Sequence, residues 1–564
     1  MNTLAHISDL VRAAVEREFP GQNVPIAQRS QDERFGDYQS NAAMPLAKAL
    51  GQPPRAVAEK LMEAVAWQGV TEQPQIAGPG FINFRLTPAF LGAQVAAIAA
   101  DPVHAGVATV ANPQTVVLDF SSPNVAKRLH VGHIRSTILG SAMYKVLKFL
   151  GHHPIGDNHV GDWGTQFGLL IVAHRRWGVD PDLDPIEGLE ALYKKASALA
   201  KEDPELADEA RAELAKLQQG DPANRALWKE FVDVSRQDVD SLYAMLDVTF
   251  DHWHGESFYE PYLAEIVERL ERTGLAVEDQ GALVIFFGED ETPFIIRKKD
   301  GAYLYSTTDI ATLEYRLREF HPERILYFVD RRQALHFKQL FDVAGRMGIK
   351  DVELEHIGFG SIMGKDGKPL KTRDGETPSL RALLQEGIDS AYRLVKENRP
   401  ELPEEKLASI ARAVGIGAIK YADLSQNRNT DYKFDLEKMI AFDGNTGPYL
   451  QYTHARICSI FRKLEGPWTV PATVELVHED EISLARALVR YEETLVKVAE
   501  SCMPNYLADH LFTLARAYSA FYTNCPVLKS EGATRDNRLA LCLAVRHQLA
   551  TGLTTLGIEP LEEM

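Results

Sequence analysis

Cysteine is scarce in this sequence, and the few positions it occupies argue against two classes of stabilised domain. Only 4 cysteines occur among 564 residues, and no two of them form a CxxC pair. They lie in the last fifth of the chain, at Cys458, Cys502, Cys525 and Cys542. This spacing argues against a disulfide scaffold and against a thiolate zinc site. We therefore expect reduced thiols in a packed core, with no structural metal and no tightly bound cofactor.

Long apolar runs and a basic excess are missing as well. No segment approaches the roughly 18 uninterrupted apolar residues that a membrane-spanning helix needs. The N-terminal sequence lacks the basic leader and apolar core of a signal peptide, so we expect a cytoplasmic protein without a membrane partner. Lys and Arg number 61 against 79 Asp and Glu, a net charge of −18, which argues against a protein that coats DNA through bulk charge. Specific RNA binding through a local basic patch stays open, and we expect Lys420, Arg428 and Arg456 to gather on such a face.

The organisation that is present indicates three domains. Residues 1–110 are Ala-rich and mostly helical in period, with an alternating segment at 78–86, which predicts a small α+β domain. Residues 111–378 alternate strand and helix patterns, which predicts a doubly wound parallel α/β sheet, with a Glu-, Lys- and Ala-rich helical insertion near 186–250. Residues 379–564 are helical in pattern and predict a helical bundle. The expected strands of the middle domain are 116–120, 154–164, 282–287, 324–329 and 352–357, and its expected helices include 165–177, 308–319 and 333–347.

Two histidines in the first strand-to-helix turn are candidates for chemistry, because ligands of such sheets bind beyond the carboxyl ends of the strands. In SSPNVAKRLHVGH, His130 and His133 stand three apart where a helix is expected to begin, so both imidazoles can face one point. A helix N-terminus favours anions, and imidazole donors beside Lys127 suit a phosphate on which negative charge develops. Gly132 lets a ligand approach the backbone. Zinc binding by the pair is disfavoured, because no HExxH motif or nearby Cys supplies further ligands; a chance surface pair is the plain alternative.

A cluster of cations follows the last expected strand. The segment GSIMGKDGKPLKTRDGET, residues 360–377, carries Lys365, Lys368, Lys371 and Arg373 among 4 glycines. Mobile cations at this edge of a sheet suit a polyphosphate that is bound and then released as pyrophosphate. The P-loop pattern GxxxxGK[ST] is absent, which disfavours P-loop kinases and ATPases. A basic surface loop without function is the alternative.

These segments resemble those of class I aminoacyl-tRNA synthetases. HVGH and KPLKT resemble the HIGH and KMSKS signatures of that class, although KPLKT lacks the Met-Ser core. Six segments in order resemble arginyl-tRNA synthetases in particular, over essentially the whole chain: SSPNVAKRLHVGHIRST, NHVGDWGTQFG, YLYSTTDIA, DRRQALHF, GKDGKPLKTRDG and FDGNTGPYLQYTHAR. Six ordered matches are far more specific than any one of them.

The resemblance implies a fold, a reaction and partners. The middle region becomes a Rossmann-type catalytic domain, preceded by a domain that meets the tRNA elbow and followed by an anticodon-binding helical domain. The implied reaction activates L-arginine with ATP and Mg²⁺ to arginyl-adenylate and then transfers arginine to the 3′ end of tRNA(Arg). The family is usually monomeric, needs tRNA for arginine activation, and requires no editing domain, because a guanidinium pocket rejects competitors in one step.

The resemblance also assigns roles to residues at matching positions. Phosphate stabilisation falls to His130 and His133, with Lys127, Lys368 and Lys371 sharing the pyrophosphate role. The arginine contacts are Ser122, Asn124, His133, Tyr305, Asp309 and Gln333, and the ATP contacts are His130, Gly132, His133, Asn158 and Gly161. The tRNA contacts are Tyr449, Tyr452, Arg456, Tyr38, Gln39 and Asn41. Among these, Asp309 is our specificity residue, because a carboxylate and a guanidinium match in bidentate geometry.

Two other functions stay open on the sequence alone. Another synthetase or a small-molecule nucleotidyltransferase could carry an HxGH word, but a one-domain transferase leaves the helical C-terminal region unexplained. A non-catalytic RNA-binding relative could keep the fold without activity. The presence of His130, His133, Asp309 and the lysines in one chain argues against such a loss.

Overall fold

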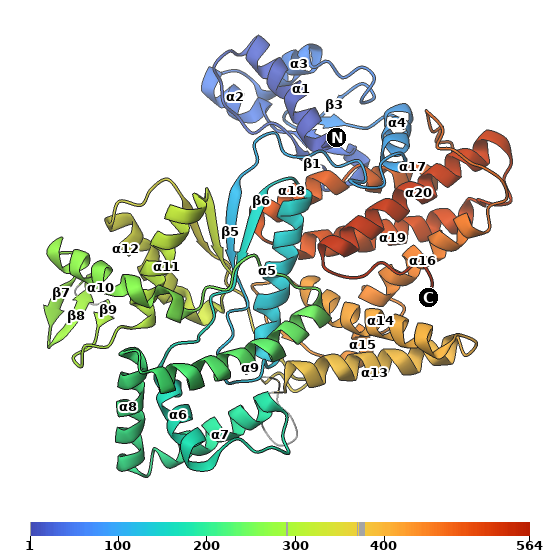
Figure 1. Ribbon diagram of the computed structural model, residues 1–564. Coiled ribbons are helices and arrows are strands. Elements are labelled where there is room, and N and C mark those ends of the chain that lie inside the picture. The colour runs from blue at the N-terminus through green and yellow to red at the C-terminus, as the bar shows by residue number, and fades with distance from the viewer. Residues whose placement is uncertain (1, 289–290, 369, 371–377) are drawn as a thin grey trace. The chain divides into compact units, whose positions relative to one another are not determined.

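The computed structural model describes residues 2–288, 291–368, 370 and 378–564, which form two compact units. One unit is Ala111–Ile440, and the other combines Met1–Val110 with Ala441–Met564 (Figure 1). The domain boundary drawn at residue 378 falls inside the larger unit, because helices α13 (Leu380–Asn398) and α14 (Glu404–Leu424) pack there. A buried ion pair, with Nε of Arg135 3.1 Å from Oδ2 of Asp423, ties α14 to helix α5. Helical periodicity alone does not reveal which unit a helix joins.

A parallel sheet of four strands forms the centre of the larger unit. Its order is β11-β10-β5-β6, and its strands are β5 (Thr115–Asp119), β6 (His153–Asp157), β10 (Arg324–Tyr327) and β11 (Glu353–His356). All three strand pairs are parallel, which confirms the predicted doubly wound sheet. The apolar runs form buried strands because helices cover the sheet. The carboxyl ends of β5 and β6 lie side by side, with Asp119 opposite Asp157.

The strand predicted at 282–287 exists but belongs to another sheet, so its assignment to the parallel sheet was wrong. Strands β7 (Val277–Asp279), β8 (Ala282–Ile285) and β9 (Phe294–Arg297) form a separate antiparallel sheet. Gln280 and Gly281 connect β7 to β8 and both have positive φ, 49° and 86°. Two such residues make a tight hairpin, whereas a parallel crossover needs a dozen or more residues. The hairpin turn therefore dictates antiparallel pairing.

Helices lie on both sides of the parallel sheet of the larger unit (Figure 1). Its other elements are α5 (Val131–Phe149), α6 (Thr165–Trp177), α7 (Pro185–Leu199), α8 (Pro204–Gln218), α9 (Pro222–Leu246), α10 (Glu256–Arg272), α11 (Tyr305–Phe320), the 3-10 turn η2 (Arg331–Gln333), α12 (Ala334–Arg346), β12 (Ile362–Met363), β13 (Tyr432–Lys433) and α15 (Leu436–Met439). Strands β12 and β13 form a third, two-stranded sheet of this unit. Helices α7, α8 and α9 form the predicted insertion. Each begins with an Asp N-cap followed by Pro at the first helical position, the combination that favours a helix start.

The smaller unit joins an α+β part to a helical bundle. Its elements are α1 (Thr3–Glu18), β1 (Gln28–Arg29), the 3-10 turn η1 (Glu33–Phe35), β2 (Tyr38–Ser40), α2 (Ala43–Leu50), α3 (Pro54–Ala64), β3 (Gln75–Ala77), β4 (Phe81–Phe84), α4 (Pro88–Ala99), α16 (Gly447–Arg462), α17 (Glu479–Leu488), α18 (Tyr491–Ser501), α19 (Asn505–Asn524) and α20 (Gly532–Thr555). The four strands form one antiparallel sheet in the order β1-β2-β4-β3. No helix among the described residues is long and apolar enough to cross a membrane.

Candidate active site

The loop that follows β5 adopts a strained conformation that its neighbours hold in place. Ser121, Ser122 and Ala126 all have positive φ, at 70°, 47° and 61°, which non-glycine residues rarely adopt. The backbone N–H of Ser121 donates to Oγ of Ser136 at 2.8 Å, and the Ser122 hydroxyl donates to Oδ1 of Asp119 at 2.9 Å. Such strain persists only where surrounding contacts fix it, and it commonly marks a functional site.

Asn158, at the end of β6, is one of those fixing residues. Its side chain is fully buried, and its Oδ1 accepts the backbone N–H of Ser122 at 3.1 Å. Its Nδ2 donates to the hydroxyl of Tyr243 in α9 at 3.0 Å. Both ends of the amide are therefore occupied, and the structure gives Asn158 a positioning role in place of the ATP contact that we expected.

A close approach of two loops explains Gly161. Asn124 and Gly161 form a parallel bridge, in which the N–H of Val125 donates to the Gly161 carbonyl at 3.1 Å. A Cβ on Gly161 would lie 2.4 Å from Oδ1 of Asn124, so a side chain there would displace the Asn124 amide. Gly161 thus brings the loop after β6 against the loop after β5, which leaves Asn124 exposed at the carboxyl edge of the sheet.

His130 and His133 together form a capping box at the N-terminus of α5. Nδ1 of His133 accepts the backbone N–H of His130 at 3.2 Å, and Nδ1 of His130 accepts the N–H of Gly132 at 3.0 Å. The two rings lie with their centroids 3.9 Å apart. Because each Nδ1 accepts a hydrogen bond, each neutral ring carries its proton on Nε2. Gly132 is required here, since a Cβ would lie 2.8 Å from the His130 ring. The site thus presents two Nε2–H donors at a helix N-terminus.

Burial keeps this pair neutral. Burial, together with the neighbouring His130, lowers the pKa of His133 to about 4. Burial also lowers the pKa of His130, against an opposing effect of Glu190. Neutral imidazoles at physiological pH keep the Nδ1 acceptors that the helix cap needs, and they leave both Nε2–H groups to donate to an anion.

Helix α7 of the insertion holds the segment between the loop and the histidines. Arg128 is ion-paired with Glu187 and, at 2.7 Å from Nε to Oε2, with Glu190. Nζ of Lys127 lies 5.2 Å from the ring centroid of Tyr193 in the same helix. On the other side, the backbone of Leu380 donates to the carbonyl of Leu129 at 2.8 Å. The HVGH segment is therefore clamped between the insertion and the start of α13.

Asp309 lies at the start of α11 between two histidines. Nε2 of His336, in α12, donates to Oδ2 of Asp309 at 2.6 Å, and Nε2 of His159 lies 3.9 Å from Oδ1. Residue spacing in the sequence could not pair these groups, because they come from three separate elements. His159 follows Asn158 directly, so the Asp309 carboxylate adjoins the loop after β6.

Tyr305 and Gln333 flank this carboxylate. Tyr305 opens α11, its ring centroid lies 4.9 Å from that of His336, and the residue is 58% exposed. Gln333 ends the turn η2 and is exposed beside α12. Both side chains are exposed to solvent.

A buried ion-pair network fixes α11, and sequence reasoning missed it. Arg316 is fully buried, with Nη2 2.8 Å from Oδ2 of Asp119 and Nε 3.0 Å from Oδ2 of Asp157. Burial alone would raise the pKa of Asp157, but Arg316 and His254 outweigh it and hold that pKa well below its usual range. Arg316 stands seven residues after Asp309, on the same face of the helix. The feature of the sequence that could have indicated this network is the pair of aspartates at the ends of two adjacent strands.

Two further carboxyl groups, those of Glu256 and Asp162, lie in the neighbourhood of Asp309. Glu256 begins α10, and burial together with the charges of Asp162 and Asp309 raises its pKa to about 8. Asp162 accepts hydrogen bonds from the N–H and hydroxyl of Ser257, at 2.8 and 2.6 Å. Glu256 is therefore neutral at pH 7, and a cation bound beside these carboxyls would stabilise their ionised forms.

The lysine loop lies only partly within the described residues. Lys371 and Arg373 fall outside them. Lys368 is exposed, and Lys365 Nζ lies 3.2 Å from Oδ1 of Asp435. Strand β12, just before the loop, pairs in parallel with β13, which anchors one end of the loop segment.

The residues expected to contact tRNA lie in the smaller unit and differ in accessibility. Tyr38 is fully buried and donates to Oε2 of Glu493 at 3.1 Å, so the structure assigns it to the core in place of the tRNA surface. Gln39 is half-buried and donates to Asn83 at 2.8 Å. On α16, Tyr449 is half-buried, whereas Tyr452 and Arg456 are exposed. Asn41 is half-buried near the start of α2.

The prediction of a basic surface formed by Lys420, Arg428 and Arg456 is wrong for two of these three residues. Lys420 is 1% exposed and Arg428 is 9% exposed, so neither can meet a polyanion on the surface. Nζ of Lys420 donates to the carbonyl of Leu246, and Nη1 of Arg428 donates to the carbonyl of Gly358 at 2.7 Å. Both cations satisfy backbone acceptors inside the larger unit.

The fold and the site together define a class of enzyme. A parallel sheet, an HxGH helix start with two imidazole donors and a downstream lysine loop are the features of a class I aminoacyl-tRNA synthetase. The comparisons with known proteins agree. Residues 94–436 match the family described as tRNA synthetases class I (R), catalytic domain; residues 450–564 match the DALR anticodon binding domain; residues 4–86 match the arginyl tRNA synthetase N terminal domain.

Individual relatives narrow the class to one member. The arginine–tRNA ligase of a Synechococcus species is 45% identical over 100% of this chain and 99% of its own length. That of Erwinia tasmaniensis is 44% identical over the full length of both chains. The crystal structure of arginyl-tRNA synthetase from Plasmodium falciparum superposes with a TM-score of 0.85 at 28% identity, covering 100% of this chain and 99% of the other. The chain belongs to the arginyl-tRNA synthetase family of class I.

Proposed function

We propose that the chain carries out the arginine–tRNA ligase reaction at the carboxyl edge of its parallel sheet. In the first step, a carboxylate oxygen of L-arginine attacks the α-phosphorus of ATP, which enters as its magnesium complex. The bond from that phosphorus to the bridging oxygen breaks, and pyrophosphate leaves with the electron pair. In the second step, the oxygen of a terminal ribose hydroxyl of tRNA(Arg) attacks the carbonyl carbon of the adenylate. The bond from that carbon to the phosphate oxygen breaks, and AMP leaves with the electron pair while the hydroxyl proton passes to its phosphate.

The histidine pair is the observation that supports this chemistry most directly. Nε2–H groups of His130 and His133 donate to the α-phosphate oxygens, on which charge grows as the pentacoordinate transition state forms. The donors are fixed before the reaction by their Nδ1 hydrogen bonds, at 3.0 and 3.2 Å, so little reorganisation is needed. The positive end of the α5 dipole and Gly132 add to the same phosphate site.

Lysines take the charge of the leaving pyrophosphate. Lys127 is exposed three residues before His130 and is held near Tyr193, so its ammonium can reach the β- and γ-phosphates. We assign the same role to Lys368 and to Lys371 in the loop that follows β12. Cations on a loop can close on the polyphosphate and then release it.

The carboxylate of Asp309 selects the substrate side chain. A guanidinium forms a bidentate pair with a carboxylate, and the ammonium of lysine cannot match this geometry. The negative potential comes from Asp309 and Asp162, because Glu256, with a pKa of about 8, is neutral at pH 7. Tyr305 and Gln333 complete the pocket, while Ser122, Asn124 and His133 contact the α-amino and carboxylate end. The Ser122 hydroxyl already donates to Asp119, so it serves that end as an acceptor.

The tRNA binds to the smaller unit, where it contacts exposed and half-buried side chains. Tyr452 and Arg456 on α16 suit splayed anticodon bases, because aromatic faces stack on bases and arginine contacts backbone or base edges. Gln39 and Asn41 offer amides to a tRNA loop, and Tyr449 borders the same helix face. We propose a monomer that acts in the cytoplasm, where its tRNA substrate is charged.

Aminoacylation of total tRNA tests the proposal. The purified protein is given ATP, Mg²⁺ and each proteinogenic amino acid in a separate reaction, and acid-stable charging of tRNA is measured. We expect charging with arginine alone. Charging with a different amino acid would overturn the Asp309 pocket, and absence of any charging by folded protein would favour the non-catalytic relative.

A further inference from the structure

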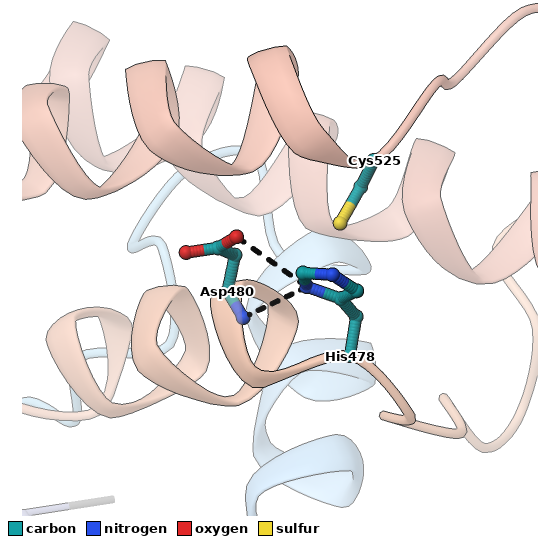
Figure 2. A group of neighbouring side chains, drawn as sticks. All are labelled: His478, Asp480 and Cys525. Atoms are coloured by element: carbon teal, nitrogen blue, oxygen red, sulfur yellow. Dashed lines mark hydrogen bonds and ion pairs between the residues drawn. The ribbon is translucent and has the colours of Figure 1, made fainter.

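Three side chains with different metal-binding atoms converge at one end of the C-terminal helical bundle. His478 is the N-cap of α17, Asp480 lies in the first turn of that helix, and Cys525 is the C-cap of α19. A ring nitrogen, a carboxylate oxygen and the thiol sulfur lie within 4.8 Å of one another. Figure 2 shows the thiol of Cys525 pointing toward the imidazole of His478, with the carboxylate of Asp480 beside the same ring. All three residues belong to the smaller unit and have no part in the proposed reaction.

The backbone positions of these ligands are fixed by other contacts. Oε2 of Glu481 accepts the N–H groups of Val477 and His478, at 2.9 and 3.0 Å, and Oε1 accepts Nε of Arg538 at 2.7 Å. Nδ2 of Asn524 donates to Oδ2 of Asp480 at 2.9 Å, which ties the end of α19 to the start of α17. A ligand set on two helix ends that are joined in this way is held close to its binding geometry before any ion arrives.

We propose that His478, Asp480 and Cys525 form a binding site for a thiophilic divalent cation of the zinc class. Thiolate, imidazole and carboxylate are the ligands that Zn²⁺ takes in proteins, and thiolate disfavours Mg²⁺ and Ca²⁺. The side chain of His478 is 46% exposed, so the ion can enter from solvent and complete its coordination with water. The expectation of no metal came from the lack of a CxxC or HExxH pattern, and three ligands from separate helix ends show no such pattern.

The thiol supplies the second observation that points to a ligand. Cys525 is 0% exposed, and within the described ranges no hydrogen bond to its sulfur is recorded. A metal binds the thiolate, so its entry must displace the thiol proton. Binding at neutral pH is therefore expected to release a proton and to weaken as pH falls.

When a cation binds to Nδ1 of His478, the imidazole gives up the hydrogen bond that this nitrogen accepts. Nδ1 of His478 accepts the backbone N–H of Asp480 at 3.2 Å and lies 3.4 Å from Oδ2 of the same residue. A cation on this nitrogen replaces one neutral hydrogen bond, which contributes far less than a metal–imidazole bond. The freed N–H lies in the first turn of α17, where solvent can reach it.

Cobalt and zinc titrations of the full-length protein test the site. Chelator-treated protein is titrated with CoCl₂ while the thiolate-to-cobalt charge-transfer band is recorded, and with ZnCl₂ by calorimetry in two buffers of different ionisation enthalpy. We expect a cobalt–thiolate band, one zinc ion per chain at this site, a released proton, and no displacement of cobalt by MgCl₂. Absence of the band in folded protein would overturn the proposal.

Variants assign the signal to these residues. Cys525→Ser and Asp480→Asn are expected to weaken zinc binding by at least about tenfold, and Cys525→Ser to abolish the band. His478→Asn keeps a good N-cap but removes the imidazole, and it should weaken binding similarly. Cys458→Ser is the matched control, because Sγ of Cys458 lies 3.8 Å from Nδ1 of His454 within the same unit. A band that survives Cys525→Ser, or that Cys458→Ser removes, would contradict the assignment. Asp480 is half-buried and Asn has nearly the same shape as Asp, so Asp480→Asn keeps the test valid if Cys525→Ser does not fold.

Discussion

Oδ2 of Asp309 lies 2.6 Å from Nε2 of His336, which joins the N-terminal half of α11 to the first turn of α12. Seven residues further along α11, Arg316 holds the helix to the ends of β5 and β6 through Asp119 and Asp157. The candidate specificity carboxylate is thus fixed from two sides. A fixed carboxylate can discriminate a planar guanidinium from other cations, because it does not rearrange to suit a poorer partner.

Asp309→Asn is expected to abolish efficient use of arginine. Loss of a charge partner in a desolvated site costs about 2–5 kcal/mol, which lowers kcat/KM for arginine by tens to thousands of times. The KM for ATP should change little. Steady-state aminoacylation at varied arginine and varied ATP separates the two. Asp342→Asn, which removes an exposed carboxylate ion-paired with Arg346 in α12, is the control. Unchanged arginine kinetics in Asp309→Asn would refute the pocket.

His133→Ala should slow the chemical step more than it weakens substrate binding. Removal of one donor to a developing oxyanion typically costs about 100–1,000-fold in kcat. Single-turnover formation of the adenylate, with tRNA present, measures this step. An effect confined to the Michaelis constants would show that His133 binds substrate without stabilising the transition state.

The pH dependence of kcat should not show His133 titrating near neutrality. Burial lowers the pKa of His133 to about 4, so the ring is neutral above about pH 5 and keeps its Nδ1 acceptor. Below that range, protonation of Nδ1 removes the hydrogen bond from the N–H of His130 and the rate should fall. A kcat profile in the wild type that declines with a pKa near 6.5, and loses that step in His133→Ala, would contradict the neutral pair.

Arg128→Gln tests whether helix α7 positions the histidines. Arg128 stands two residues before His130, and the change removes its ion pairs with Glu187 and Glu190. A small displacement of catalytic groups can cost up to about 100-fold in rate, and we expect roughly tenfold in kcat with little change in KM. Arg176→Gln, which breaks the exposed ion pair with Glu209 of α8, should leave kcat unchanged. Equal effects of both changes would mean that only general stability was lost.

Arg456→Ala tests the proposed tRNA surface. The guanidinium lies 4.3 Å from the ring centroid of Tyr522 and is exposed on α16, so its loss should raise the KM for tRNA by about tenfold. The KM for arginine should be unaffected. Arg462→Ala, in the last turn of the same helix, removes a guanidinium that donates to the carbonyl of Glu562 and serves as control. A tRNA KM that responds equally to both changes would place the contact elsewhere.

The periodicity of the sequence predicted helices and strands better than it predicted which strands and side chains pair with one another. The strands at 116–120 and 324–329 were found because buried parallel strands are continuous apolar runs. The strand at 282–287 was assigned to the wrong sheet because its Gln280-Gly281 turn, and not its apolar content, decides the pairing. The contacts of His159 and His336 with Asp309 could not be predicted from the sequence, since these residues meet only where α11, α12 and the loop after β6 pack together.

The same limit explains why Lys420 was misplaced on the surface. Charge alone suggested a tRNA contact, but the side chain reaches inward to the carbonyl of Leu246. Burial lowers the pKa of Lys420 from 10.5 to about 7, with Lys145 acting in the same direction and Asp247 against it. A lysine in such a site destabilises the fold whenever it must be charged.

Lys420→Met should therefore stabilise the protein, most strongly at low pH. Below about pH 7 the folded and unfolded chains both hold the proton, so the full cost of the buried charge is present, on the order of 5 kcal/mol at most. Between pH 7 and about 10.5 the unfolded chain binds more protons than the folded chain, so wild-type stability rises with pH.

The melting temperature, measured against pH, checks this prediction. The gain from Lys420→Met should be largest below pH 7 and should shrink as pH rises toward 10.5, the ordinary lysine pKa. Lys338→Met, at a position whose side chain is 69% exposed in α12, should give no pH-dependent gain. A Lys420→Met variant that is less stable than the wild type at every pH would show that the bond to Leu246 outweighs the burial of the charge.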